Sequence, residues 1–240
     1  MRATTNPGRA AGEAEKAAGT SIRWRSRRAE DNAMTTEAVV YVIDDDESVC
    51  RALARLIQSG GLEVETFKSA EEFLKRTPAH CPRCLVLEVR LPGTSGLDLQ
   101  ASLGRAQATM PIIFVTGHGN VPLSVRAMKN GALDFLQKPF HDQELLDAIQ
   151  RALARSRIAL SEQAECASIQ GRLATLTPRE RQVLGLVVRG MLNKHIADEL
   201  GAAEKTIRIH RGRAMKKMQA NSVAEVVTMT HKIGLVDARV

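Results

Sequence analysis

The chain has 240 residues, 44% of them hydrophobic, and a formal net charge of +7, so its length predicts two domains at roughly 100 to 200 residues each. It lacks both the ~18 to 20 consecutive apolar residues of a membrane span and a signal-peptide pattern, so we expect a cytoplasmic protein with no membrane partner. Four cysteines are too few for a disulfide framework, which fits a reducing compartment.

The charge is unevenly distributed along the chain. Residues 1–36 carry 7 basic and 4 acidic side chains, residues 37–171 carry 14 and 17, and residues 172–240 carry 13 and 6. A basic segment attached to a mildly acidic one is the electrostatic pattern expected of a nucleic-acid-binding protein.

Residues 1–36 are rich in Ala, Arg, Gly and Thr and show little periodicity, which predicts a disordered basic tail. Because Met34 directly precedes the first predicted strand, an over-extended start of the coding sequence is an alternative. A nucleic-acid or membrane role for the basic stretch 21–28 is another.

From residue 38 onward, apolar strands alternate with amphipathic helices, which is typical of a parallel sheet covered by helices. We expect strands at 39–43, 63–67, 84–88, 111–116 and 133–137. Ser69 and Glu72 form a capping-box pattern, and Pro122 lies just inside another helix start. The pattern predicts a domain at 37–157 of the α/β class, with a flavodoxin-like, doubly wound, parallel five-stranded sheet.

Polar side chains follow these strands, and the carboxyl ends of parallel strands meet at one edge of a sheet. Paired carboxylates suit Mg²⁺, and an ammonium suits an acid or its phosphoryl group. The residues expected at this edge are Asp44, Asp45, Glu88, Thr116 and Lys138.

With Pro92-Gly93, Gly117-His118-Gly119 and Lys138-Pro139, the set resembles the phosphoacceptor pocket of bacterial response-regulator receiver domains. The resemblance implies a cis Lys138-Pro139 bond, a switch through Thr116 and Phe135, and a sensor histidine kinase as partner. It also implies Mg²⁺ bound by Asp44, Asp45, the acid at position 88 and the carbonyl of Arg90.

The acceptor in that family is aspartate, and here it is Glu88. Glu88 could act as a fixed phosphoryl mimic that biases Thr116 and Phe135 towards the active state. It could equally mark a decayed pocket in a protein regulated by its abundance. A carboxylate carries one negative charge against nearly two for a phosphoryl group, so mimicry would be partial. Both interpretations predict a regulator that is independent of phosphorylation or constitutively biased.

Three other interpretations concern the same domain. Asp44 and Asp46 also fit the paired aspartates of haloacid-dehalogenase-like phosphohydrolases, an alternative function. The acidic run could instead cap the first helix. Cys81-Pro82-Arg83-Cys84 has the spacing of a redox or zinc half-site, although no second pair accompanies it.

The fifth helix of the first domain begins near His141, and its apolar stripe weakens after Leu153. We expect it to continue as a helical linker over 158–172 and to end at Gly171.

Residues 173–240 are predicted to form a small all-α domain. Thr177-Pro178-Arg179-Glu180 combines an N-cap, a proline in the first turn and a capping glutamate. With the segments 193–201 and 204–218, this stretch resembles the LuxR-type helix-turn-helix of the FixJ/NarL response regulators.

Within the predicted helix 204–218, Ile207, Ala214, Met215 and Met218 can face the core. Arginines can read guanine, Ile209 can contact a thymine methyl, and Lys216 and Lys217 are expected on the DNA backbone. The whole predicted contact set is Lys205, Thr206, Arg208, Ile209, Arg211, Gly212, Arg213, Lys216 and Lys217. His210 is either structural or a phosphate contact, and Ala202 and Ala203 offer no hydroxyl cap.

A last helix from Ser222 to about Ile233 carries Val223, Val226, Val227 and Thr230 on one face. In the family this helix pairs two DNA-bound copies, although core packing would also explain the stripe. The sequence therefore predicts a transcription regulator rather than an enzyme, with double-stranded DNA and RNA polymerase as partners and a homodimer on DNA.

Overall fold

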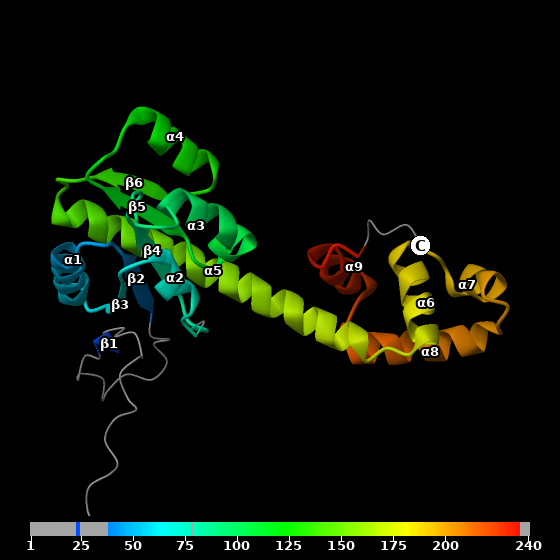
Figure 1. Cartoon of the computed structure of the whole chain (residues 1–240). Coiled ribbons are helices and arrows are strands. Elements are labelled where there is room, and N and C mark those ends of the chain that lie inside the picture. The colour runs from blue at the N-terminus through cyan, green and yellow to red at the C-terminus, as the bar shows by residue number, and fades with distance from the viewer. Residues whose placement is uncertain (1–22, 25–37, 78, 236–240) are drawn as a thin grey trace, which may run out of the picture. The chain divides into compact units, whose positions relative to one another are not determined.

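The computed structural model describes residues 23–24, 38–77 and 79–235, which divide into two compact units between Arg157 and Ile158 (Figure 1). The disordered tail predicted over 1–36 lies almost wholly outside the described residues. An unexpected short strand, β1 (Arg23–Trp24), pairs antiparallel with β3 (Glu63–Phe67). Across the described part of the chain, no helix is long and apolar enough to cross a membrane.

The first unit is built on a sheet of strand order β1-β3-β2-β4-β5-β6. Its strands β2 (Val39–Ile43), β3, β4 (Arg83–Leu87), β5 (Ile112–Thr116) and β6 (Asp134–Gln137) are all parallel. The flavodoxin-like prediction is confirmed, and each of these five strands lies within one residue of its predicted bounds. Strand β2 lies at the centre of this sheet, between β3 and β4.

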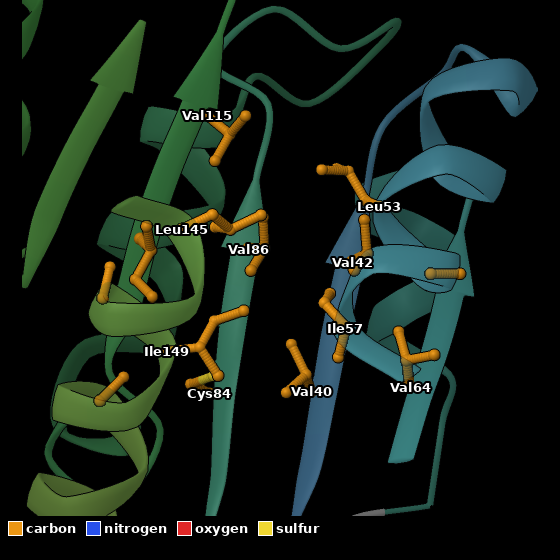
Figure 2. Packing of buried hydrophobic residues seen from close by; sticks show 14 of the residues in the cluster. Val40, Val42, Leu53, Ile57, Val64, Cys84, Val86, Val115, Leu145 and Ile149 are labelled. Carbon is orange, nitrogen blue, oxygen red and sulfur yellow. The ribbon is translucent and has the colours of Figure 1, made fainter. Parts of the chain in front are cut away.

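Helices cover both faces of the sheet. Val40 and Val42 face α1 (Glu47–Ser59) and the start of α5 (Asp142–Ala174), as Figure 2 shows. The alternate β2 residues Val39, Tyr41 and Ile43 pack towards α2 (Ala70–Leu74), α3 (Gly96–Leu103) and α4 (Val121–Lys129). A short 3₁₀ helix, η1 (Gly104–Ala108), follows α3. Burial on both faces explains why the strands are continuous apolar runs.

The predicted local signals act as helix caps. The hydroxyl of Ser69 accepts from the Glu72 N–H, and the Glu72 carboxylate accepts from the Lys68 N–H rather than from that of Ser69. Pro122 lies in the first turn of α4, and the Lys138-Pro139 bond is cis, as predicted.

Helix α5 does not end at Gly171 but continues to Ala174, so that prediction was wrong. Tertiary packing holds its last turn, because Ile169 and Leu173 are buried in the core of the second unit and Arg172 donates to the Met218 carbonyl at 3.3 Å. Residues 158–172, predicted as a separate linker, therefore belong to the second unit.

The second unit consists of the end of α5 and the helices α6 (Pro178–Val188), α7 (Asn193–Glu199), α8 (Glu204–Met218) and α9 (Val223–Lys232). One cluster joins Leu173 to Ala214 and Val226, and another joins Val183 to Ile196 and Ile207. Both clusters include α8, so one face of that helix is fixed against the unit.

Candidate functional site

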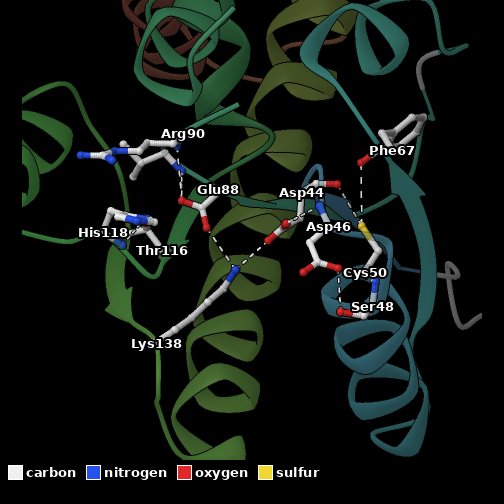
Figure 3. A network of polar contacts seen from close by, with 11 residues as sticks. Asp44, Asp46, Ser48, Cys50, Phe67, Glu88, Arg90, Thr116, His118 and Lys138 are labelled. Atoms are coloured by element: carbon white, nitrogen blue, oxygen red, sulfur yellow. Dashed lines mark hydrogen bonds and ion pairs between the residues drawn. The ribbon is translucent and has the colours of Figure 1, made fainter. Parts of the chain in front are cut away.

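An ion cluster lies at the carboxyl ends of the strands, where Asp44, Glu88 and Lys138 follow β2, β4 and β6 (Figure 3). The Lys138 Nζ lies 2.6 Å from Asp44 Oδ2 and 3.0 Å from Glu88 Oε2. The two acidic side chains are only 5% and 8% exposed. One ammonium thus bridges two buried carboxylates, as the sequence predicted for Lys138 and an acid.

The second oxygen of Glu88 is turned back onto its own loop. Glu88 Oε1 accepts from the Val89 N–H at 2.9 Å and from the Arg90 N–H at 3.3 Å. With Lys138, the carboxylate has three donors, and hydrogen bonds to an ionised group are the strong ones. No sequence pattern predicts this geometry, because it depends on the side-chain rotamer of one glutamate.

Burial and hydrogen bonds oppose each other in setting the pKa values of the two residues beside Glu88, Asp44 and Lys138. Burial raises the pKa of Asp44, and the hydrogen bonds from Lys138 and from the Asp46 N–H only partly oppose it. Burial works to lower the pKa of Lys138, but the hydrogen bonds to Asp44 and Glu88 outweigh it and raise that pKa. Lys138 therefore remains an ammonium at neutral pH.

The residues do not fit the predicted magnesium site as they are arranged. Asp45 is exposed, and no group of three His, Cys, Asp or Glu side chains in the described ranges is placed to hold a metal ion. Each carboxylate oxygen of Asp44 and Glu88 already accepts at least one hydrogen bond, so Mg²⁺ would have to share these oxygens with their present donors or displace them.

The two predicted switch residues are not bonded to Glu88. Thr116 is fully buried, and its hydroxyl accepts from the His118 N–H at 3.2 Å. Phe135 is half-buried and packs against Phe114, with ring centroids 6.1 Å apart. Within the described residues, the contact that would couple Glu88 to this pair is not made.

Gly96 is a pocket residue that the sequence reasoning missed. A Cβ at this position would lie 2.2 Å from the Glu88 carbonyl oxygen, and the Gly96 N–H donates to the Val89 carbonyl at 2.9 Å. The backbone of α3 thus packs directly on the loop that carries Glu88. A glycine in a helix first turn, just after a strand-end acid, could have signalled this approach.

Two of the other interpretations find no support in the geometry. Asp46 is the N-cap of α1, as the capping interpretation predicted, and its carboxylate accepts from the Ser48 N–H at 2.7 Å and from the Ser48 hydroxyl at 2.6 Å. It meets Asp44 through its backbone N–H at 3.0 Å, so the two carboxylates are not paired as the phosphohydrolase interpretation requires. Cys84 is fully buried in β4, where burial raises the pKa of its thiol.

The second unit presents one charged face of α8. Ile207, Ala214 and Met218 are buried and Met215 is half-buried, as predicted. Arg211 is half-buried and donates to Asn193 Oδ1 of α7 at 2.9 Å, while Arg208 lies 3.6 Å from Glu204. The exposed members of the predicted contact set are Lys205, Thr206, Arg208, Ile209, Gly212, Arg213 and Lys216.

Lys217 differs from its neighbours, because its ammonium has hydrogen-bond partners within the unit. Its Nζ donates to Glu180 Oε2 at 2.7 Å and to the Thr175 carbonyl at 3.0 Å. Glu180 is buried, and it completes the predicted capping box with Thr177. Lys217 is thus engaged within the unit as an ion-pair partner of Glu180, with its side chain 36% exposed.

Three further predictions concern the start of α8, His210 within α8, and helix α9. No side-chain cap begins α8 at Ala203, as predicted. His210 is half-buried, and its Nδ1 has no hydrogen-bond partner among the residues described. In α9, Val226 and Thr230 are buried and Val223 and Val227 half-buried, so packing within the unit accounts for much of that stripe.

Comparison with known proteins gives matches to both units. Residues 40–150 match the model of the response regulator receiver domain, and residues 174–230 match that of bacterial regulatory proteins of the luxR family. The chain is 49% identical over 212 residues to Nodulation protein W of Bradyrhizobium diazoefficiens, covering 88% of this chain and 93% of that protein.

Two further matches cover nearly the whole of the matched protein. Identity to the transcriptional regulatory protein FixJ of Bradyrhizobium diazoefficiens is 41%, over 85% of this chain and all of FixJ. Among solved structures, the response regulator StyR is similar with a TM-score of 0.72 and 43% identity, over 82% of this chain and 99% of that one.

Proposed function

This chain belongs to the FixJ-like response regulators, which join a receiver domain to a LuxR-type DNA-binding domain, and we propose that it acts without phosphorylation at position 88. It is a transcription regulator of the two-component type, and that family is not a class of enzymes. Receiver domains generally bind Mg²⁺ for phosphorylation, and a response regulator usually has a kinase partner. Our proposal is that this chain depends on neither.

The observation that carries the proposal is the set of donors around Glu88. Lys138 Nζ, the Val89 N–H and the Arg90 N–H all bind the Glu88 carboxylate. In a phosphorylated pocket, such donors would serve the phosphoryl oxygens. Here the longer acid side chain uses them itself, so an added phosphoryl group would have to displace existing bonds.

The same geometry supports a partial rather than a full mimic. The Glu88 charge is paired with Lys138, yet the hydroxyl of Thr116 is engaged elsewhere. A group shifts the balance of two conformations only through interactions that differ between them. We therefore expect a fixed, intermediate level of DNA binding, set by the amount of protein.

The DNA contacts are assigned to the exposed face of α8. Arg208 and Ile209 would read base edges in the major groove, and Lys205, Arg213 and Lys216 would bind phosphates. Two copies would bind half-sites about one helical turn apart, and RNA polymerase would be the partner at the promoter.

The test compares the natural chain with Glu88→Asp in radiolabelled acetyl phosphate and Mg²⁺. DNA affinity is measured on a duplex that the natural chain selects from a random-sequence library. We expect label on the aspartate variant only, and an affinity of the natural chain that acetyl phosphate does not change. Label on Glu88 at the level of the aspartate variant would contradict the proposal.

Glu88→Gln separates the two forms of phosphorylation independence, since it keeps the shape of the side chain and removes its charge. A partial mimic predicts DNA binding weakened by about tenfold, which is ~1.4 kcal/mol. A decayed pocket predicts no change. Asp45→Asn, at an exposed acid of the loop between β2 and α1, is the control for lost charge.

A further inference from the structure

The exposed face of α8 has a gap at its centre. One stripe of α8 lies on the side of the helix opposite the buried residues Ile207, Ala214 and Met218. Its members are separated by helical spacings of three, four and seven residues. All its members are exposed, and all but one are long side chains. The stripe consists of Lys205, Arg208, Ile209, Gly212 and Lys216.

Nothing within the described structure requires a glycine at position 212. A Cβ there would meet no described atom within 4 Å, and Gly212 is not among the residues with positive φ. Glycine in a helix interior is less favourable than any ordinary residue other than proline. An alanine would fit the fold and strengthen the helix, so the isolated molecule gains nothing from Gly212.

We propose that Gly212 is the point of closest approach between α8 and DNA, where a base edge in the major groove lies against the helix backbone. This proposal rests on the DNA binding proposed above and adds a determinant of specificity to it. Arg208 and Ile209 lie one turn before the gap and Lys216 one turn after it. A side chain at 212 would hold the helix away from the groove and withdraw Arg208 and Ile209 from the bases.

The neighbouring arginine does not fill the gap. Arg211 is held at 2.9 Å by Asn193, so its guanidinium lies beside α7, on the flank of the stripe. The major groove of B-DNA admits an α-helix, whose central residues face the base edges while its flanks face the phosphates. Gly212 is central in this sense, and Arg211 is on a flank.

The second unit offers a matched control for the glycine itself. Gly185 also lies within a helix, α6, is also exposed, and has no described atom within 4 Å of an added Cβ. It lies outside the α8 stripe. Gly185→Ala and Gly212→Ala should therefore stabilise their helices alike and differ only if position 212 meets a ligand.

The experiment uses the full chain and its Gly212→Ala, Gly212→Leu and Gly185→Ala variants. We expect Gly212→Ala and Gly185→Ala both to raise the melting temperature of the second unit by about 4 °C. On a duplex selected by the natural chain, Gly212→Ala should bind about tenfold more weakly, Gly212→Leu more weakly still, and Gly185→Ala as the natural chain does. On an unselected duplex of equal length, the losses should be smaller, because phosphate contacts dominate there.

Unchanged affinity of both Gly212 variants for the selected duplex would overturn the proposal, as would an equal loss in Gly185→Ala. Arg208→Ala separates this failure from that of the proposed function. If Arg208→Ala weakens binding and relaxes base preference while the Gly212 variants do neither, the proposed DNA binding by α8 is supported and the proposed close approach at Gly212 is rejected. If the natural chain selects no duplex from the library, both the proposed sequence-specific DNA binding and the proposed close approach at Gly212 are rejected.

Discussion

The two charged regions of the molecule use lysine in opposite ways. In the first unit, Lys138 bridges two buried carboxylates and is committed to the interior. On α8, Lys205 and Lys216 are exposed at one face. Charges paired inside a protein fix a local geometry, whereas exposed charges of one sign attract a ligand of the other sign. The ion cluster of the first unit therefore favours one local conformation, and the exposed face of α8 favours binding of a polyanion.

The largest expected effect comes from breaking the paired region. Lys138→Ala would leave Asp44 and Glu88 buried without their counter-charge, which we expect to cost about 3 kcal/mol of the free energy of unfolding. The measurement is urea unfolding of the full chain, with hydrogen exchange of β2 and β4 assigning the loss to the first unit.

Lys68→Ala is the matched control, because it breaks the pair of Lys68 and Glu47, whose side chains are 66% and 55% exposed. Exposed pairs contribute roughly 0 to 1 kcal/mol. If the two variants were equally stable, the Lys138 bridge would not be a stabilising feature and the contrast between the two regions would fail.

How far the sequence predicts this contrast depends on the range of the contacts involved. The strands and the start of α6 follow from local signals: apolar runs bounded by turns, and the capping box of Thr177 and Glu180. The meeting of Asp44, Glu88 and Lys138 follows from the parallel order of the strands. Each of these needs only neighbouring residues or one topological rule.

The differences from expectation arise where distant residues or the direction of a single side chain decide the outcome. Lys217 pairs with Glu180, which is 37 residues away, and its position beside Lys216 does not indicate this contact. Helix α5 passes Gly171 because Leu173 packs into the second unit, and tertiary packing outweighs a weak local preference. The exposure of Asp45 depends on side-chain direction in one short loop, which no spacing pattern specifies.

A smaller effect is expected within α8, where the adjacent lysines Lys216 and Lys217 differ in their contacts. Lys216→Ala should leave stability unchanged, weaken DNA binding, and reduce the slope of log affinity against log salt by about 1. Lys217→Ala should lower the melting temperature of the second unit by about 4 °C and leave that slope unchanged. Equal effects of the two variants on this slope would show that Lys217 contacts DNA phosphates as Lys216 does.

The smallest effect is a pH dependence of the second unit. Hydrogen bonds from the Lys217 ammonium and the Thr177 N–H lower the pKa of Glu180 to about 2. Because the folded pKa lies below the ordinary value, the stabilisation by ionised Glu180 is complete above about pH 5 and is lost as the pH falls towards about 2. Glu180→Gln cannot lose this term, so the difference in stability between the natural chain and the variant should narrow on acidification within that window. A difference that stays constant from pH 6 to about pH 2 would show that the pair of Lys217 and Glu180 is not ionic, and the contrast between Lys217 and the exposed Lys216 would fail.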